Sequence, residues 1–133
     1  MHKILVAYDG GEPAHRALAL AADLARRFDA VIGVVSVTPV HPGSVPIDPW
    51  DRPDVHTAEL LEAQNILREW GIEADLLQSA GDPAKTIERI AHDGRYDTVI
   101  VGSRGLSVLS RALQGSVSEH VATHSEATVI VAR

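Results

Sequence analysis

Glycines and a serine recur in the last third of the chain at a spacing suited to holding a phosphate. Gly102 ends an apolar run, Gly105 follows three residues later, and Gly115 and Ser116 come after nine further residues. A glycine has no Cβ, so a ligand can approach its N–H group closely. The residues after Gly115 read as a helix start, where free N–H groups and the helix dipole favour an anion. The spacing predicts a phosphate-binding loop, although Gly102 alone is equally compatible with an ordinary turn.

Asp9 stands at the end of a second apolar run, residues 3–8. A carboxylate beside a phosphate is repulsive unless a divalent cation or a ribose hydroxyl lies between them. One carboxylate together with phosphates is an ordinary arrangement for Mg²⁺. An aspartate at this place also serves simply to cap the following turn, and the residues alone leave both interpretations open.

Other chemistry finds little support in the residues. His120 and His124 have a metal-ligand spacing, but no third ligand or intervening glutamate accompanies them, which favours two surface histidines. Arg104 and Arg111 are close enough along the chain to reach a terminal phosphate, but solvated arginines are the plainer interpretation. The sequence has no Gly-x-Ser-x-Gly elbow, no Walker-type lysine and no general base directed at a γ-phosphate.

Length and composition indicate one globular domain, 1–133, with 45% apolar residues. The net charge of −6 argues against a nucleic-acid partner, because phosphate-binding faces are normally basic. The chain has no cysteine, which excludes disulfides and thiol catalysis. The apolar run at 4–8 is too short for a signal peptide, and no stretch approaches transmembrane length, so we expect a cytoplasmic protein without a membrane partner.

Strands and helices alternate along the chain. Apolar runs predict strands at 3–8, 30–37, 73–78, 98–101 and 127–132, the third of them polar enough for a sheet edge. Helices are expected after 10–13, from 55 to 70, after 82–83, and from 116 to 123. Their buried positions are expected to be Leu18, Ala21, Ala22, Ala25 and Phe28, then Leu60, Ala63, Leu67 and Trp70, then Ile87, Ile90 and Ala91. Residues 38–53 hold five of the seven prolines and are expected to form a surface loop.

This alternation predicts a three-layer α/β fold around a five-stranded parallel sheet. The natural strand order is 3-2-1-4-5, in which the first and fourth strands are neighbours and their helices leave on opposite faces. Ligands bind in the crevice that opens at the carboxyl ends of such strands. Asp9 ends the first strand and Gly102 ends the fourth. The topology therefore brings the carboxylate and the glycine loop together.

The glycine spacing resembles the nucleotide-binding signature of the universal stress protein family. The segment 3–10 (KILVAYDG) resembles that family's first strand with its terminal aspartate, 81–87 (GDPAKTI) resembles the start of its third helix, and 127–132 (ATVIVA) its last strand. The resemblance covers the chain apart from about residues 39–55. It implies a Rossmann- or flavodoxin-like, adenine nucleotide α-hydrolase-like fold. Gly11 departs from the serine of many members and is a weaker helix cap.

The resemblance implies that ATP, with Mg²⁺ at Asp9, binds in this crevice. The implied nucleotide contacts are Ala7, Tyr8, Asp9, Val37, Val101, Gly102, Ser103, Arg104, Gly105, Gly115, Ser116 and Val117. Val37 would supply an apolar wall for the base, and plain core packing is the alternative. We expect a nucleotide-binding stress-response module with at most slow hydrolysis. A small nucleotide-using enzyme of the same fold, and a dimeric scaffold that binds no nucleotide, remain the alternatives.

The last strand suggests how two copies would associate. In the order 3-2-1-4-5 it lies at an edge, and its residues Thr128, Val129, Ile130 and Val131 include no proline and no charge. A bare apolar edge is an aggregation hazard unless something covers it. Pairing with the same strand of a second copy would satisfy both edges, and the family resemblance also implies a homodimer here.

Overall fold

The computed structural model describes residues 1–39, 53–102 and 127–133. Within them, five parallel strands form one sheet in the order β3-β2-β1-β4-β5. The strands are β1 (Lys3–Ala7), β2 (Val31–Pro39), β3 (Ala74–Gly81), β4 (Thr98–Gly102) and β5 (Thr128–Ala132). This confirms the predicted α/β class, the strand order and the place of the third strand at an edge.

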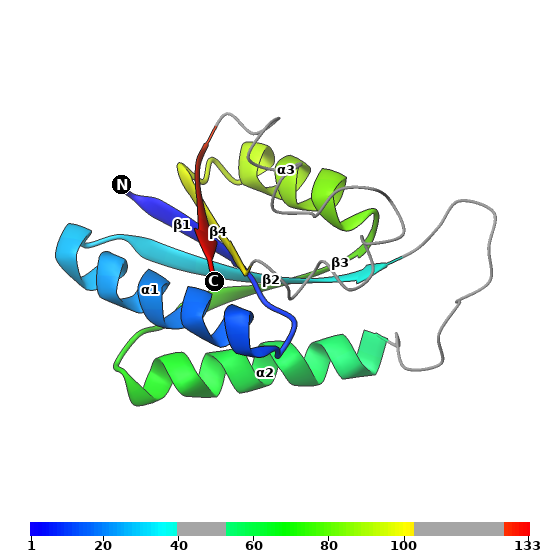
Figure 1. The fold of residues 1–133 in the computed structure, drawn as a ribbon, viewed down its shortest axis with the longest axis horizontal. Coiled ribbons are helices and arrows are strands. Elements are labelled where there is room, and N and C mark those ends of the chain that lie inside the picture. The colour runs from blue at the N-terminus through cyan, green and yellow to red at the C-terminus, as the bar shows by residue number, and fades with distance from the viewer. Residues whose placement is uncertain (40–52, 103–126) are drawn as a thin grey trace.

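Helices cover both faces of the sheet. The helices α1 (Glu12–Phe28) and α2 (Pro53–Glu69) lie side by side on one face, and α3 (Pro83–Asp93) lies on the other (Figure 1). In the described segments, no helix is both long enough and apolar enough to cross a bilayer. The helix expected at 116–123 and most of the expected proline-rich loop lie outside the described residues.

Successive side chains of β1 and β2 point to opposite faces, as the two-residue period of a strand requires. The core beneath α1 and α2 receives Ile4 and Val6 from β1, Tyr8 from the position just after β1, and Ile32 and Val34 from β2. The core beneath α3 receives Leu5 and Ala7 from β1, and Val35 and Val37 from β2. Both strands are buried on both faces, which explains why their sequences are continuous apolar runs rather than alternating ones.

The helix starts follow local chemistry. Asp82 caps α3 by accepting a hydrogen bond from the Lys85 N–H at 3.0 Å, and Pro83 occupies the first turn, as predicted. Gly11 stands at the N-cap of α1 without a side-chain cap. The helix α2 begins at Pro53, which the sequence analysis assigned to the preceding loop. A proline suits this first helical position because its missing N–H would be unpaired there in any case.

Two residues expected in the core are exposed. Phe28 is 54% exposed, because it ends α1 one turn beyond Ala25, the last buried residue of that helix. Trp70 is 39% exposed, because α2 ends at Glu69 and the Trp70 N–H bonds back to the Leu67 carbonyl oxygen in a tighter turn. The predicted helical stripes therefore fail only at their last positions, where the helical period no longer applies.

Candidate functional site

The carboxyl ends of β1 and β4 meet at the first turn of α1. Beyond the end of β1, the Asp9 Oδ1 atom accepts a hydrogen bond from the Gly11 N–H at 3.0 Å. Asp9 therefore caps the turn that leads into α1, which is the plainer of its two predicted roles. The cap fixes this carboxylate at the edge of the sheet where ligands bind in parallel α/β folds.

Gly102, the last residue of β4, is packed against the same turn. A Cβ atom at this position would lie 2.9 Å from the Pro13 carbonyl carbon and 3.0 Å from the Ala14 nitrogen. Real Cβ atoms do not approach backbone so closely, so a glycine is needed for α1 to start beside the end of β4. The start of the glycine loop and the turn that carries Asp9 are thus held together by one helix turn.

Three of the predicted contact residues share one buried cluster. Ala7, Val37 and Val101 lie in the core beneath α3, near the carboxyl ends of three adjacent strands. Val37 is only 3% exposed, so its side chain packs as core, the alternative that the sequence analysis kept open. Its contact with a base remains a prediction.

Tyr8 lies on the opposite face from these three residues. Its side chain is buried in the core beneath α1 and α2, and its hydroxyl donates a hydrogen bond of 2.6 Å to the Glu62 Oε1 atom of α2. Burial and this hydrogen bond raise the pKa of Tyr8 far above its usual range. A contact between Tyr8 and a ligand on the α3 side would therefore have to come from its backbone.

His15 completes a cluster with Tyr8 and Glu62. Its Nε2 atom lies 2.9 Å from the Tyr8 hydroxyl oxygen and 3.0 Å from the Glu62 Oε1 atom, and its Nδ1 atom lies 2.9 Å from the Gly11 carbonyl oxygen. The hydrogen bond from Tyr8 lowers the pKa of Glu62, and the contacts with His15 act in the same direction. The cluster links the residue just after β1 to α1 and α2, beside the turn that carries Asp9.

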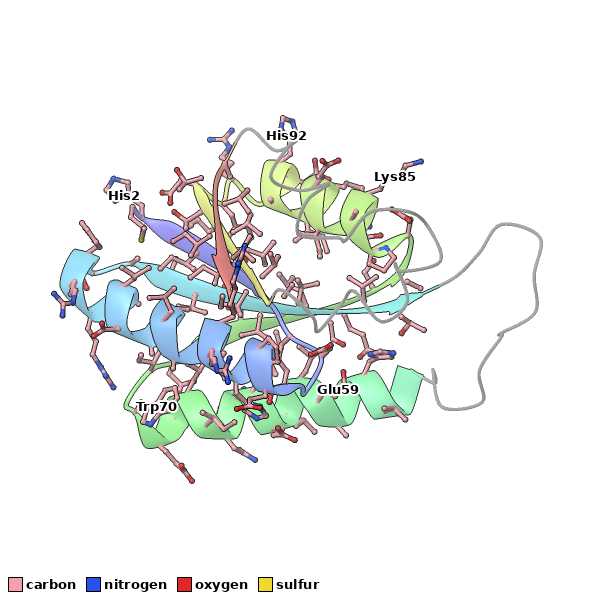
Figure 2. The ribbon with its side chains drawn as sticks, viewed as in Figure 1. His2, Glu59, Trp70, Lys85 and His92 are labelled. Carbon is pink, nitrogen blue, oxygen red and sulfur yellow. The ribbon has the colours of Figure 1, made fainter. Side chains whose placement is uncertain are left out.

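A second polar cluster joins β2 to α2. The Ser36 hydroxyl lies 2.9 Å from the His56 Nδ1 atom and 3.3 Å from the Glu59 Oε2 atom, and the same His56 nitrogen lies 3.2 Å from that oxygen. Glu59 lies on the side of α2 that faces the start of α1 (Figure 2). Burial raises the pKa of Glu59 most; His56 opposes this rise, and the charge of Asp9 adds to it.

These three residues have the composition of a hydrolase triad but not its geometry. In such a triad the serine and the acid bind different nitrogens of the imidazole. Here Ser36 and Glu59 both contact Nδ1 of His56, and Ser36 is only 1% exposed. The cluster offers no accessible nucleophile, and its contacts instead fix α2 against the carboxyl end of β2.

Known proteins are similar to this chain over its whole length. The model of the universal stress protein family matches residues 1–133. This chain belongs to the universal stress protein family. A universal stress protein of Methanocaldococcus jannaschii is 30% identical, with 98% of this chain and 81% of the relative covered.

Solved structures agree as well. The universal stress protein UspA of Lactobacillus plantarum has a TM-score of 0.73 at 26% identity, covering 99% of this chain and 97% of that one. The universal stress protein of Archaeoglobus fulgidus in complex with dAMP has a TM-score of 0.76 at 24% identity, covering 100% of this chain and 98% of that one. These universal stress proteins share the fold described above.

Part of the predicted site of this universal stress protein lies outside the described residues. These residues are Ser103, Arg104, Gly105, Gly115, Ser116 and Val117; Arg111, His120 and His124, which were not predicted site residues, also lie outside the described segments. Within segments 1–39, 53–102 and 127–133, no group of three or more histidine, aspartate or glutamate side chains is arranged to hold a metal ion.

Neither of the two polar clusters of this universal stress protein was predicted from the sequence. One signal was available for each. For the Ser36–His56–Glu59 cluster, the signal is that Ser36 is a polar residue within the apolar run of β2. For both clusters, His56, Glu59 and Glu62 recur every three residues on α2, which places these side chains on one face of the helix. His15 gives no such signal, because its partner Glu62 is distant in the sequence and meets it only when α1 packs beside α2.

Proposed function

We propose that this universal stress protein binds ATP together with Mg²⁺ at the carboxyl ends of β1 and β4. The observation that carries the proposal is the first turn of α1, which holds the Asp9 turn and the end of β4 together. Gly102 leads directly into the sequence that contains Gly105, Gly115 and Ser116. The phosphates would lie on this loop and the adenine against Val37, with Mg²⁺ or the ribose at Asp9.

The charge around Asp9 fits a cation that accompanies phosphates. Asp9 lies close enough to Glu59 for its charge to raise the pKa of that residue. Two neighbouring carboxylates repel a bare phosphate but attract a divalent cation, and Mg²⁺ bound to phosphates commonly takes only one or two protein carboxylates. The Archaeoglobus fulgidus relative, which holds dAMP, supports an adenine nucleotide as the ligand class.

We infer a binding module rather than an enzyme. The Ser36–His56–Glu59 cluster offers no accessible nucleophile, and the sequence lacks a Walker-type lysine. Nucleotide binding would act as a signal in a cytoplasmic stress response, with hydrolysis slow at most. Within the described residues β5 lies at an edge of the sheet, and Val131 on it is 38% exposed. This apolar edge supports a homodimer formed through Thr128, Val129, Ile130 and Val131.

Calorimetry with ATP, ADP and AMP, each with and without Mg²⁺, tests the proposal. We expect ATP with Mg²⁺ to bind most tightly. Gly115→Val places a branched side chain where phosphate oxygens should lie, and should weaken ATP binding at least tenfold, about 1.4 kcal/mol. Asp9→Asn should weaken binding more with Mg²⁺ than without it. Val55→Ala, an exposed position on α2, is the control. Unchanged ATP affinity in a folded Gly115→Val variant would contradict the assignment.

A further inference from the structure

Glu59 projects from α2 toward the turn that carries Asp9 (Figure 2). A Cβ atom at Gly10, the middle residue of this turn, would lie 3.7 Å from the Glu59 Cγ atom and 4.0 Å from its carboxyl carbon. Gly10 has a φ of 82°, a backbone conformation that favours glycine. The Glu59 side chain therefore packs against the face of Gly10 from which a side chain would project, next to Asp9.

Two polar contacts hold the Glu59 carboxylate in this place. Its Oε2 atom accepts a hydrogen bond from the Ser36 hydroxyl at 3.3 Å and lies 3.2 Å from the His56 Nδ1 atom. Ser36 and His56 are both buried, and the Glu59 side chain is itself only 20% exposed. Salt screens a charge in such a place much less than it screens a surface charge. The Glu59 carboxylate is therefore a fixed charge that acts on the groups around it.

A second negative charge next to Asp9 is unfavourable in the free protein. Burial raises the pKa of Glu59 most and the charge of Asp9 raises it further, whereas the contacts with His56 and Ser36 lower it. Phosphates that arrive without a metal would bring more negative charge to the same place. A divalent cation on those phosphates reverses the interaction, because both carboxylates attract it.

We propose that Glu59 is a specificity-determining residue of the nucleotide site: its carboxylate, fixed next to Asp9, repels phosphates that carry no metal, so the site selects the Mg²⁺ complex of a nucleotide over the free nucleotide. This inference rests on the nucleotide binding proposed above. It goes further by assigning the selection to a residue of α2 that does not touch the phosphates in this scheme. Ser36 and His56 contribute only by holding Glu59 in place.

The test measures ATP affinity by calorimetry, once in EDTA and once in saturating Mg²⁺. Measurements at about pH 8 keep Glu59 ionised despite its raised pKa. The ratio of the two dissociation constants gives the selectivity for the Mg²⁺ complex. We expect Glu59→Gln, which removes the charge but keeps an oxygen for the Ser36 hydroxyl, to lower this ratio about fivefold, at the lower end of couplings between linked sites. Most of the change should come from tighter binding of ATP in EDTA.

Two control variants separate the charge of Glu59 from its packing. Ser36→Ala removes one contact that holds Glu59 but keeps the charge and the contact with His56, so it should keep most of the selectivity. Glu69→Gln makes the same change in net charge at the exposed last residue of α2, about 15 Å along the helix from Glu59. It should keep the wild-type ratio, because a distant surface charge is screened.

A second measurement needs no variant to fold. Mn²⁺ takes the place of Mg²⁺ in the wild-type complex with ATP, and its unpaired electrons broaden the NMR signals of nearby groups. The side-chain signals of Glu59 should broaden at Mn²⁺ concentrations that leave those of Glu69 sharp.

Three results would overturn the inference while nucleotide binding stands. They are an unchanged ratio in a folded Glu59→Gln variant, an equal fall of the ratio in Ser36→Ala, and Glu59 signals that broaden no more than those of Glu69. No ATP binding by the wild type, with or without Mg²⁺, would overturn the proposed function and the inference with it.

Discussion

Gly102 lies so close to Pro13 that residue 102 has no room for a Cβ atom, and this close approach places the end of β4 beside the start of α1. A Cβ atom on residue 102 would lie 2.9 Å from both the Cβ and the carbonyl carbon of Pro13. The first glycine of the loop therefore has a structural task, whichever ligand the loop holds. Loss of nucleotide binding on substitution of Gly102 would not by itself identify a phosphate contact, whereas substitution of Gly115 is the sharper test.

Gly102→Ala should destabilise the protein even without nucleotide. The added methyl group must displace the first turn of α1, and overpacking of this kind costs about 1–3 kcal/mol. Urea unfolding followed by circular dichroism measures the change. Gly71→Ala is the matched reference, because Gly71 has a positive φ of 76° but open space around it, so only backbone strain of about 1 kcal/mol applies. An unchanged stability of Gly102→Ala would show that the contact with Pro13 can relax without cost.

Gly33→Ala should reveal how Tyr96 packs on β2. The ring of Tyr96 lies over Gly33, and a Cβ atom there would come within 2.8 Å of the Tyr96 Cζ atom. We expect Gly33→Ala to cost about 1–3 kcal/mol in the wild type and much less in a Tyr96→Ala background. A double-mutant cycle by urea unfolding isolates this coupling. Additive losses would mean that something other than the ring resists the methyl group.

Asp97 should make stability depend on acid pH. Its carboxylate accepts from the His2 N–H at 2.6 Å, the Lys3 N–H at 3.2 Å and the Thr98 hydroxyl at 2.9 Å. Burial alone would raise the pKa of Asp97, but these hydrogen bonds outweigh it, so the pKa lies below its usual value. The folded state therefore binds this proton less readily than the unfolded state. The resulting stabilisation is present above about pH 4 and is lost as the pH falls through the lowered pKa.

Unfolding of Asp97→Asn at several pH values tests this expectation. At neutral pH the variant should be less stable than the wild type by about 1 kcal/mol, because an amide replaces a charged acceptor. The difference should shrink once the wild-type carboxyl is protonated. Asp93→Asn, which alters an exposed aspartate at the end of α3, serves as the control and should show no comparable trend. A constant deficit at every pH would exclude a charge effect at residue 97.

Val131→Lys should disrupt the proposed dimer. Val131 is exposed on β5, whereas the neighbouring Ile130 packs against the core, so a charge at 131 interferes with pairing and spares the fold. We expect a dimer in the wild type and a monomer in the variant by light scattering at micromolar concentration. Val31→Lys is the control, since Val31 on β2 is 55% exposed. A monomeric wild type would refute the dimer.

Much of the fold follows from periodicity and from the rules of parallel sheets. The apolar runs predicted all five strands, and the alternation of strands with helices predicted their order. The start of α3 at Asp82 was also predictable, since an aspartate followed by proline is a local signal for the beginning of a helix. The same topology predicted that Asp9 and Gly102 meet at one edge of the sheet.

The parts that escaped prediction depend on how elements dock. Phe28 and Trp70 are exposed because of where the buried part of each helix stops. The helical spacing of apolar residues carries no information about that position. The contact of His15 with Glu62 requires α1 and α2 to lie side by side, and no local pattern encodes that distance. Gly102 was predicted for its N–H group, whereas the structure shows that its missing side chain accommodates α1.

The alternation of side chains along β1 has a consequence for how this protein can diversify. Ala7 faces the α3 layer, whereas its neighbour Tyr8 faces α1 and α2. Two residues that are adjacent in the sequence therefore belong to two separate core clusters. Substitutions that reshape the wall proposed to hold a base need not disturb the packing of the Tyr8 ring. A library of variants randomised on the α3 side of the sheet could therefore be screened without repairing the packing beneath α1 and α2.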